Sequence, residues 1–419
     1  MRLQRPRGTK DLFGEELQKL NEICSNIKNF LELAGYREIR TPIFEHKEVF
    51  LGTEEEYLLS NKEIFRIEGG KYILRPENTA SVARAIVENR FLCINSKSTN
   101  NKRFYYLGTY FRYERPQEGR YREFIQLGIE EINSAPIEAD ISQIALINRL
   151  LESFGINKAL TLHINYLGSK DTKIKWNEEL KKYFEEYRDQ LSEDSRERIN
   201  KNPLRILDDK EDSKLEIVKN APKIEQFLDS KEKEQIENIK ERLQKDFDMV
   251  FEWDTNLVRG IDYYTGLIYE WKYKELTVIA GGRYDELFCK FNNSVIPSLG
   301  LAIGIERFKF LLEKENYVWK NREVAPIYIA SLVGLDAKLN WLLKVFEKHN
   351  IVYWADFSIV KLNKHFEISL QTESKVMLIY GAKEQEQQGI TLKFLGSEKE
   401  GDFFEFNEEA INKLIPLIF

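Results

Sequence analysis

Two long runs in which apolar and polar residues alternate, 104–113 and 122–133, restrict the fold of this chain more than any other feature. The residues between them, Arg115 to Gly119, have the proline, glycine and polar side chains that are typical of turns. Alternation with a period of two is the pattern of a β-strand with one buried face. The two runs therefore predict a long β-hairpin with an extended loop.

Helices and short strands are expected on both sides of this hairpin. An amphipathic helix should cover 15–33 and end at Gly35, a residue favoured just after a helix C-terminus. Alternation at 36–40 predicts a strand, and Pro76 suits the first turn of a helix that continues to Val87. Further strands are expected at 64–67, 72–74, 160–165, 249–253, 267–272, 276–279 and 299–303, with helices at 139–151 and from Glu306.

The composition of the chain then changes twice. Residues 171–248 are dense in Lys, Glu and Asp at helical spacing, which indicates an inserted helical module. From Ala325 onwards strands alternate with helices, which predicts a small α/β domain with a largely parallel sheet. The expected elements of that domain are strands at 327–332, 351–354 and 376–379 and helices at 337–348 and 361–370.

Composition excludes several classes of protein. The longest apolar stretches fall far short of the roughly 18 residues that a membrane span needs, and the basic N-terminus has no apolar run behind it. We therefore expect a cytoplasmic protein with no membrane segment. The three cysteines and four histidines are too scattered for a zinc site or a disulfide framework. A net charge of −6 argues against nonspecific coating of nucleic acid, although it is compatible with a local basic surface.

The sequence has no GxGxxG, Walker, GxSxG or HExxH motif, so any phosphate chemistry needs another device. The hairpin is the best candidate, because a guanidinium matches phosphate oxygens and an aromatic face can stack on a base. On neighbouring strands, Arg112 and Phe124 would face one cleft. A solvated hairpin with cross-strand ion pairs explains the same pattern equally well. The hairpin residues concerned are Arg112, Arg115, Arg120 and Arg122, interleaved with Phe111, Tyr113, Tyr121 and Phe124.

Other short segments also carry residues capable of chemistry. In 75–79, the carboxylate of Glu77 would ordinarily only cap a helix. The polar stretch 258–266, with its glycines and paired tyrosines, is most simply a rigid turn. The segments 280–285 and 300–307 are rich in glycine, which lets a ligand approach the backbone but also permits tight packing.

Taken together and in this order, these segments resemble the histidyl-tRNA synthetases, a family of class II aminoacyl-tRNA synthetases. Residues 259–265 and 281–285 resemble the two histidine-specific motifs of the family, which are the most specific part of the likeness. The likeness covers nearly the whole chain. The other matching segments are 7–11 (opening signature), 36–42 (class II motif 1), 111–130 (motif 2), 202–208 (a recurring string in the insertion) and 300–307 (motif 3).

The resemblance implies an α+β fold. A class II synthetase catalytic domain, with an antiparallel β-sheet flanked by helices, would carry a helical insertion and be followed by a C-terminal α/β anticodon-binding domain. The two parts of the catalytic domain would be 1–170 and 249–320, the insertion 171–248 and the anticodon-binding domain 325–419. The family is usually a homodimer through motif 1, so a homodimer is expected.

The resemblance also implies a two-step reaction. L-histidine attacks the α-phosphate of ATP to give histidyl-adenylate and pyrophosphate, and the 3′ end of tRNA(His) then accepts the histidyl group. Charge builds on phosphate oxygens in this chemistry, so fixed cations are the expected catalytic device. Mg²⁺ is expected with the pyrophosphate portion of ATP, and no protein ligand to it is assigned.

Residues that match the family's ATP positions lie in the hairpin and in two later segments. Arg112 and Arg259 would hold the α-phosphate from opposite sides. Arg120 would reach the outer phosphates, Phe124 would stack on adenine, and Arg307 would clamp ATP from the other face.

Histidine would be selected by paired hydrogen bonds, because a neutral imidazole carries one donor and one acceptor. In the family pattern Glu130 takes the ring N–H and Tyr264 serves the other nitrogen, with Tyr263 and Tyr284 lining the pocket and Arg259 beside the substrate. The residues that match those holding the α-amino group are Glu77, Thr79 and Gln126, and those that match the contact with the tRNA acceptor end are Arg115 and Gln117.

Two residues depart from the family pattern, which more often has glycine at both places. Asn78 is a mild departure, because asparagine adopts positive φ more readily than most residues. Glu286 would repel the adenylate if it faced the pocket, so we expect its side chain to point away.

Three alternative functions are weighed against this interpretation. A catalytically silent paralogue, resembling the regulatory subunit that joins ATP phosphoribosyltransferase, typically lacks the Arg259 motif and the anticodon-binding domain, and this sequence has a match to both. A class II synthetase for another amino acid is disfavoured by the paired histidine motifs. A noncatalytic RNA-binding protein is disfavoured because the arginines match ATP positions rather than only a surface patch.

Overall fold

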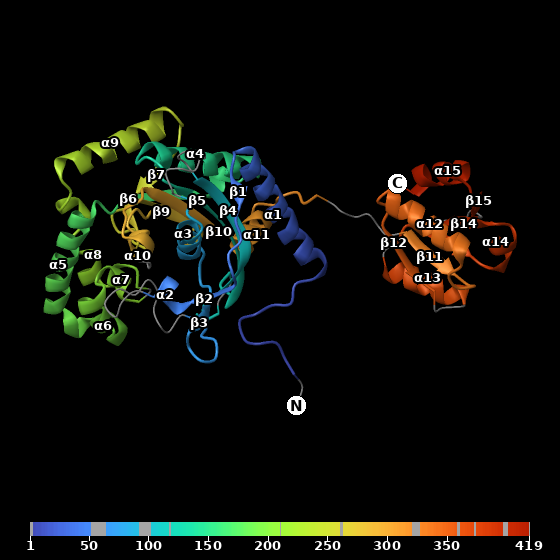
Figure 1. Ribbon diagram of the computed structural model, residues 1–419, viewed down its shortest axis with the longest axis horizontal. Helices are drawn as coiled ribbons and strands as arrows, with labels where there is room; N and C mark the ends of the chain where they lie inside the picture. Colours follow the sequence, from blue (N-terminus) through green and yellow to red (C-terminus); the bar gives the residue numbers. More distant parts are fainter. Residues whose placement is uncertain are drawn as a thin grey trace. The chain divides into compact units, whose positions relative to one another are not determined.

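A computed structural model gives the arrangement of most of the chain (Figure 1). It describes residues 3–51, 64–91, 102–116, 119–209, 211–259, 263–320, 327–357, 361–372, 374–396 and 401–418. The chain separates into two units, Met1–Val318 and Trp319–Phe419, each with its own core. The finer division of the first unit into two catalytic parts and an insertion stays a prediction.

The predicted hairpin is present as β4 (Lys102–Phe111) and β5 (Glu123–Ile132), which pair antiparallel along their whole length. Their register places Tyr110 opposite Phe124 and Phe104 opposite Glu130. Because side chains alternate between the two faces of a strand, the even-numbered residues of β5 share one face of the sheet. That face carries the residues predicted to bind ATP and histidine.

The hairpin lies within an eight-stranded sheet in the order β1-β4-β5-β10-β9-β8-β6-β7. The neighbours pair antiparallel except at the two edges, where β1 with β4 and β6 with β7 are parallel. The predicted sheet of a class II catalytic domain is therefore confirmed. The remaining strands are β1 (Arg37–Glu38), β6 (Thr161–Tyr166), β7 (Phe251–Trp253), β8 (Thr265–Tyr273), β9 (Leu276–Arg283) and β10 (Ser298–Gly304).

Helix α1 (Gly14–Leu33) follows the predicted apolar stripe and ends where it was expected. Gly35, with φ +85°, takes the left-handed conformation that closes such a helix, and the next backbone N–H, of Tyr36, donates to the carbonyl of Leu31 at 3.0 Å. The other helices of the sheet layer are α3 (Thr79–Glu88), α4 (Glu138–Ser153) and α11 (Ile305–Lys314), with the short α2 (Lys47–Phe50) and α10 (Cys289–Asn292).

Two expectations for the segment before α3 were wrong. The helix begins at Thr79, three residues after Pro76, because the Glu77 carboxylate accepts the backbone N–H groups of Thr79 and Ala80 and so sets the helix start there. The expected strand at 64–67 is only a single bridge, between Arg66 and Ile73. A small two-stranded sheet forms instead from β2 (Phe44–His46) and β3 (Tyr72–Leu74).

The charged segment after β6 is helical, as predicted (Figure 1, green to yellow-green). Its helices bury apolar stripes, such as Trp176, Leu180 and Phe184 of α5, and turn most of their charged residues to solvent. These buried residues continue into the hydrophobic cluster that holds Tyr263 and Tyr264. The helices are α5 (Lys170–Glu186), α6 (Glu193–Lys201), α7 (Leu204–Leu207), α8 (Glu216–Lys219) and α9 (Ser230–Lys245).

The C-terminal unit is an α/β domain whose sheet has the order β12-β11-β13-β14-β15. Three strands are parallel, as expected, but β14 and β15 pair antiparallel, so the sheet is mixed rather than largely parallel. The last two strands arrive through short connections, which suit antiparallel pairing. The strands are β11 (Ile327–Ser331), β12 (Tyr353–Asp356), β13 (Val376–Tyr380), β14 (Gly389–Phe394) and β15 (Asp402–Glu405), and the helices are α12 (Ala337–Lys348), α13 (Leu362–Gln371), α14 (Ala382–Glu386) and α15 (Glu408–Ile418).

Within the described part of the chain, every helix is too short or too polar to cross a membrane.

Candidate active site

A buried carboxylate lies at the centre of the sheet. Glu130 of β5 accepts a hydrogen bond from the Thr79 hydroxyl at 2.7 Å and another from the Tyr284 hydroxyl. Thr79 opens helix α3 and Tyr284 directly follows β9, so three segments distant in sequence converge here. Gly300 lies opposite Glu130 in the pairing of β10 with β5, and a Cβ at Gly300 would collide with the carboxylate.

Burial governs the charge state of this carboxylate. The side chain of Glu130 has no exposed surface, and burial raises its pKa to about 8. The two hydroxyl donors oppose that rise, and the negative charge of nearby Glu77 adds to it. A ligand that donates a hydrogen bond to Glu130 would therefore stabilise its charged form.

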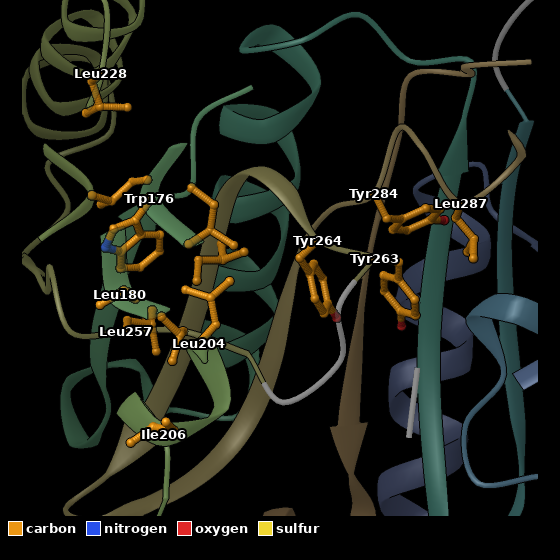
Figure 2. Close-up of a cluster of buried hydrophobic side chains, with 14 of the residues drawn as sticks. Trp176, Leu180, Leu204, Ile206, Leu228, Leu257, Tyr263, Tyr264, Tyr284 and Leu287 are labelled. Atoms are coloured by element: carbon orange, nitrogen blue, oxygen red, sulfur yellow. The ribbon is translucent and has the colours of Figure 1, made fainter. Parts of the chain in front are cut away.

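Aromatic rings surround Glu130. Tyr263, Tyr264 and Tyr284 are all buried, with ring centroids 4.8 Å apart for the first pair and 5.8 Å for Tyr263 and Tyr284. Figure 2 shows Tyr263 and Tyr284 beside each other, with Tyr264 between them and the buried side chains Trp176, Leu180 and Leu204. The charged segment thus supplies part of the packing behind the tyrosines.

Glu77 is buried at the start of α3. Its carboxylate accepts the backbone N–H of Thr79 at 2.6 Å and that of Ala80 at 3.1 Å. Burial raises its pKa, while these two hydrogen bonds and the positive charge of Arg112 oppose the rise. Glu77 therefore caps helix α3, as a carboxylate at this position ordinarily does. It also places a second buried acidic group near Glu130.

Two polar side chains beside these carboxylates have unused hydrogen-bonding atoms. The amide oxygen of Gln126 is buried and has no partner among the described residues. Asn78 is fully buried: its side-chain oxygen accepts the Thr41 hydroxyl at 2.6 Å, whereas its side-chain nitrogen has no partner in the described part of the chain. The backbone of Asn78 has φ −123°, so the positive φ considered for this departure is not needed.

Arginines gather on the same face at the loop end of the hairpin. Arg112 donates from Nε to the carbonyl of Pro76 at 2.9 Å, and its guanidinium carbon lies 5.3 Å from the centroid of the Phe124 ring. The Glu114 carboxylate faces both Arg112 and Arg120, at 4.0 and 3.7 Å. The structure therefore places Arg112 and Phe124 against each other, as the alternation predicted.

Arg307 faces this group from the first turn of α11. It donates to the carbonyl of Gly119 at 3.0 Å and to that of Thr277 at 2.6 Å, so it joins the hairpin loop to β9. Burial, together with the like charges of Arg120 and Arg112, lowers the pKa of Arg307 to about 10. A bound polyanion would relieve that repulsion.

Arg259 forms an ion pair with Glu270 of β8. Glu270 also accepts the Thr277 hydroxyl at 3.0 Å and faces Lys272 at 3.6 Å. The guanidinium carbon of Arg259 lies 5.7 Å from the Tyr264 ring centroid, which places this cation next to the tyrosine cluster. Its Nε has no hydrogen-bond partner among the described residues and can serve a ligand.

Three predicted positions lie at the edge of this site or outside the description. Arg115 is exposed in the hairpin loop, whereas Gln117 is not among the described residues. Glu286 pairs with Lys170 of α5 at 3.0 Å, so its carboxylate is directed to the charged segment. Its side chain thus has a partner outside the pocket, as we expected.

Sequence reasoning missed several residues that complete the site. Glu270 holds Arg259, and Arg75 is buried with its guanidinium 4.5 Å from the Tyr110 ring. A carboxylate between the apolar residues 267–269 and Trp271 was the available signal for Glu270. Among the described residues, no group of three or more His, Cys, Asp or Glu side chains has the arrangement of a metal site.

An eight-stranded, mostly antiparallel sheet, a hairpin that pairs an arginine with an aromatic ring, and a glycine-rich strand that leads into an arginine-bearing helix together define the catalytic core of a class II aminoacyl-tRNA synthetase. A family model described as histidyl-tRNA synthetase matches residues 8–308. The chain belongs to the histidyl-tRNA synthetase family.

Individual proteins agree with this assignment. A histidine–tRNA ligase of Malacoplasma penetrans (strain HF-2) is 40% identical over 405 residues, which cover 94% of each chain. The crystal structure of apo S. aureus histidyl-tRNA synthetase superposes with a TM-score of 0.74 at 28% identity, over 98% of this chain and 99% of that one. An ATP phosphoribosyltransferase regulatory subunit/histidyl-tRNA synthetase from Bacillus halodurans C, 19% identical with a TM-score of 0.63 over 90% and 98% of the chains, shares the fold.

Proposed function

We infer that this chain is a histidine–tRNA ligase, which activates L-histidine with ATP and transfers the histidyl group to the 3′ end of tRNA(His). Family membership and the similarity to curated histidine–tRNA ligases over nearly the full length support this function. The observation that carries it is the arrangement on one sheet face, where a buried carboxylate among tyrosines lies beside a group of guanidinium ions.

The pocket around Glu130 is proposed to hold the histidine side chain. A carboxylate oxygen has two acceptor sites, so Glu130 can accept an imidazole N–H besides the hydroxyls of Thr79 and Tyr284. Tyr264 would serve the other ring nitrogen, and Tyr263 would line the pocket. A side chain without this donor and acceptor would leave buried groups unpaired, which is the physical basis for rejecting it.

The α-amino group of histidine is proposed to lie near Glu77 and Gln126. The amide oxygen of Gln126 is an acceptor with no donor in the described part of the chain, and Glu77 carries a second buried carboxylate. An ammonium group next to these oxygens would offset the cost of burying them. Thr79, between Glu77 and Glu130, would then border both ends of the substrate.

The arginines are proposed to bind ATP. Arg112 and Arg259 would contact the α-phosphate, Arg120 the outer phosphates, and Phe124 with Arg307 would enclose the adenine. Arg112 and Arg307 are held by backbone carbonyls, and Arg259 by Glu270, before any ligand binds. Prepositioned charge needs little reorganisation when negative charge develops on phosphate oxygens.

Several finer features belong to the same proposal. Magnesium would accompany ATP and be held mainly by its phosphate oxygens, since Glu114 and Glu270 face arginines. Arg115 and Gln117 would meet the acceptor end of the tRNA, and the C-terminal unit would bind the anticodon. We further propose that the enzyme is a cytoplasmic homodimer.

The test is ATP–pyrophosphate exchange without tRNA, measured against the full panel of standard amino acids. Exchange with histidine alone, followed by charging of tRNA(His), is the expected result. A chain that melts at a higher temperature with histidine but shows no exchange would be a histidine sensor, and the phosphate roles would have to be withdrawn.

A further inference from the structure

The N-terminal segment, residues 6–9, crosses the base of the hairpin loop. No role has yet been assigned to this segment. The backbone N–H of Arg122 donates to the carbonyl of Gly8 at 2.8 Å. The segment is itself turned, since the N–H and the hydroxyl of Thr9 both bond to the Pro6 carbonyl, at 3.2 and 2.8 Å. A third backbone segment is therefore attached to the loop beyond the end of the paired strands.

Arg122 links this attachment to the ATP arginines. Its carbonyl accepts the backbone N–H of Arg112 at 3.0 Å, so Gly8, Arg122 and Arg112 form a continuous row of backbone hydrogen bonds. Its Nε donates to the carbonyl of Glu114 at 3.1 Å, and its guanidinium carbon lies 4.0 Å from the Tyr113 ring centroid. Arg122 thus holds the backbone of Arg112 and that of Glu114, whose carboxylate faces Arg112 and Arg120.

Glycine is required at position 8 for two reasons. Its φ of +87° lies in the left-handed region that favours glycine. A Cβ there would also lie 2.8 Å from Cγ of Arg122, 3.0 Å from its Cδ and 3.0 Å from Cγ of Pro116. Any side chain at this position would therefore push Arg122 and the loop away from the N-terminal segment.

We propose that Gly8 and Arg122 form a clasp that positions Arg112 and Arg120 for ATP. Both are positioning residues, because they act on ATP only through the loop and its arginines. The physical reason is entropic: arginines whose backbone and neighbours are already fixed by the clasp lose less conformational freedom when they bind the phosphates. This inference rests on the proposed function and extends it to the N-terminal segment.

The experiment compares Gly8→Ala with Gly14→Ala. Gly14 also has a positive φ, +58°, but a Cβ there has no neighbour within 4 Å, so this control carries the backbone strain without the displacement. In histidine-dependent exchange, Gly8→Ala should lower kcat/KM for ATP by about 10- to 100-fold, since small misplacements of reacting groups have effects of this size. KM for histidine should stay unchanged, and Gly14→Ala should leave both constants unchanged.

A second variant guards against a simple folding defect. Arg122→Lys keeps the row of backbone hydrogen bonds and the charge but loses the hydrogen bond from Nε to the Glu114 carbonyl. It should therefore lower kcat/KM for ATP by a smaller factor than Gly8→Ala does. Equal effects of Gly8→Ala and Gly14→Ala, or equal losses for histidine and ATP, would overturn the clasp. Absence of exchange in the wild-type chain would instead contradict the proposed function itself.

Discussion

Gly300 lies directly opposite Glu130 where β10 pairs with β5, and the carboxylate of Glu130 fills the space that a side chain at Gly300 would take. The hydroxyls of Thr79 and Tyr284 then hold the carboxylate in place. The glycine of one strand therefore limits where the carboxylate of the next strand can lie. This relationship ties the motif 3 strand to the proposed histidine pocket, although motif 3 was expected to serve ATP.

Gly300→Ala should weaken histidine binding. The new methyl group would displace the Glu130 carboxylate, so KM for histidine should rise by about tenfold or more, which corresponds to about 1.4 kcal/mol. Gly304→Ala is the matched control on the same strand, because its Cβ would meet the Arg307 side chain only at ordinary contact distances of 3.6 Å and beyond. Similar histidine KM values for the two variants would contradict the proposed pocket.

Arg259→Ala should reduce histidine-dependent exchange by about 100- to 1,000-fold, as expected for removal of one prepositioned charge from a transition state. The histidine-induced rise in melting temperature should persist. Arg259→Lys is the control, because it keeps a cation for the buried Glu270 and so separates catalysis from the stability of the ion pair. Full exchange activity in Arg259→Ala would exclude this residue from catalysis.

The stability of the ligand-free protein should depend on pH through Glu130. Burial raises its folded-state pKa to about 8, so the folded protein binds one more proton than the unfolded chain between the ordinary glutamate pKa of about 4.3 and pH 8. The contribution of protonated Glu130 to the free energy of unfolding is therefore fully present below this window and is lost as pH rises through it. Glu130→Gln cannot ionise, so its melting temperature relative to wild type should increase from pH 5 to pH 8.5. A constant difference would show that Glu130 ionises normally.

Glu286→Gly should leave histidine activation unchanged, although it restores the residue more common in the family. Glu286 pairs with Lys170 at a partly exposed position, so its loss should change the free energy of unfolding by about 0–1 kcal/mol. Glu286→Gln, which removes the charge without adding glycine flexibility, is the control. A lower KM for histidine or ATP in both variants would show that the carboxylate repels substrate after all.

Local pattern was enough for most of the elements. Alternation predicted the bounds of both hairpin strands to within two residues, and the apolar stripe predicted those of α1 to within one residue. The start of α3 was wrong because proline is only a preference for the first turn, whereas the Glu77 carboxylate bonds to the first helical N–H groups. The antiparallel end of the C-terminal sheet was also missed, since short strands after β13 give no sign of their pairing direction.

The candidate site residues came largely from motif resemblance, and their partners came from the structure. Arg259 was chosen from its motif, but nothing local pointed to Glu270, eleven residues later, as its ion-pair partner. The contact between Gly8 and Arg122 likewise joins residues that share no pattern. Such contacts depend on strand register and on packing across the sheet, which a local pattern does not encode.

By itself, the sequence determined the hairpin, the main helices, the charged helical segment, the α/β character of the C-terminal unit and the family resemblance, because periodicity and motifs are local properties. Only the tertiary structure decided that Thr79, Glu130, Tyr284 and Gly300 meet at one point, and that Arg112, Arg120 and Arg307 lie close enough to repel one another. The physical reason is that burial and charge proximity, which set the pKa values of Glu130 and Arg307, arise only when distant segments pack together.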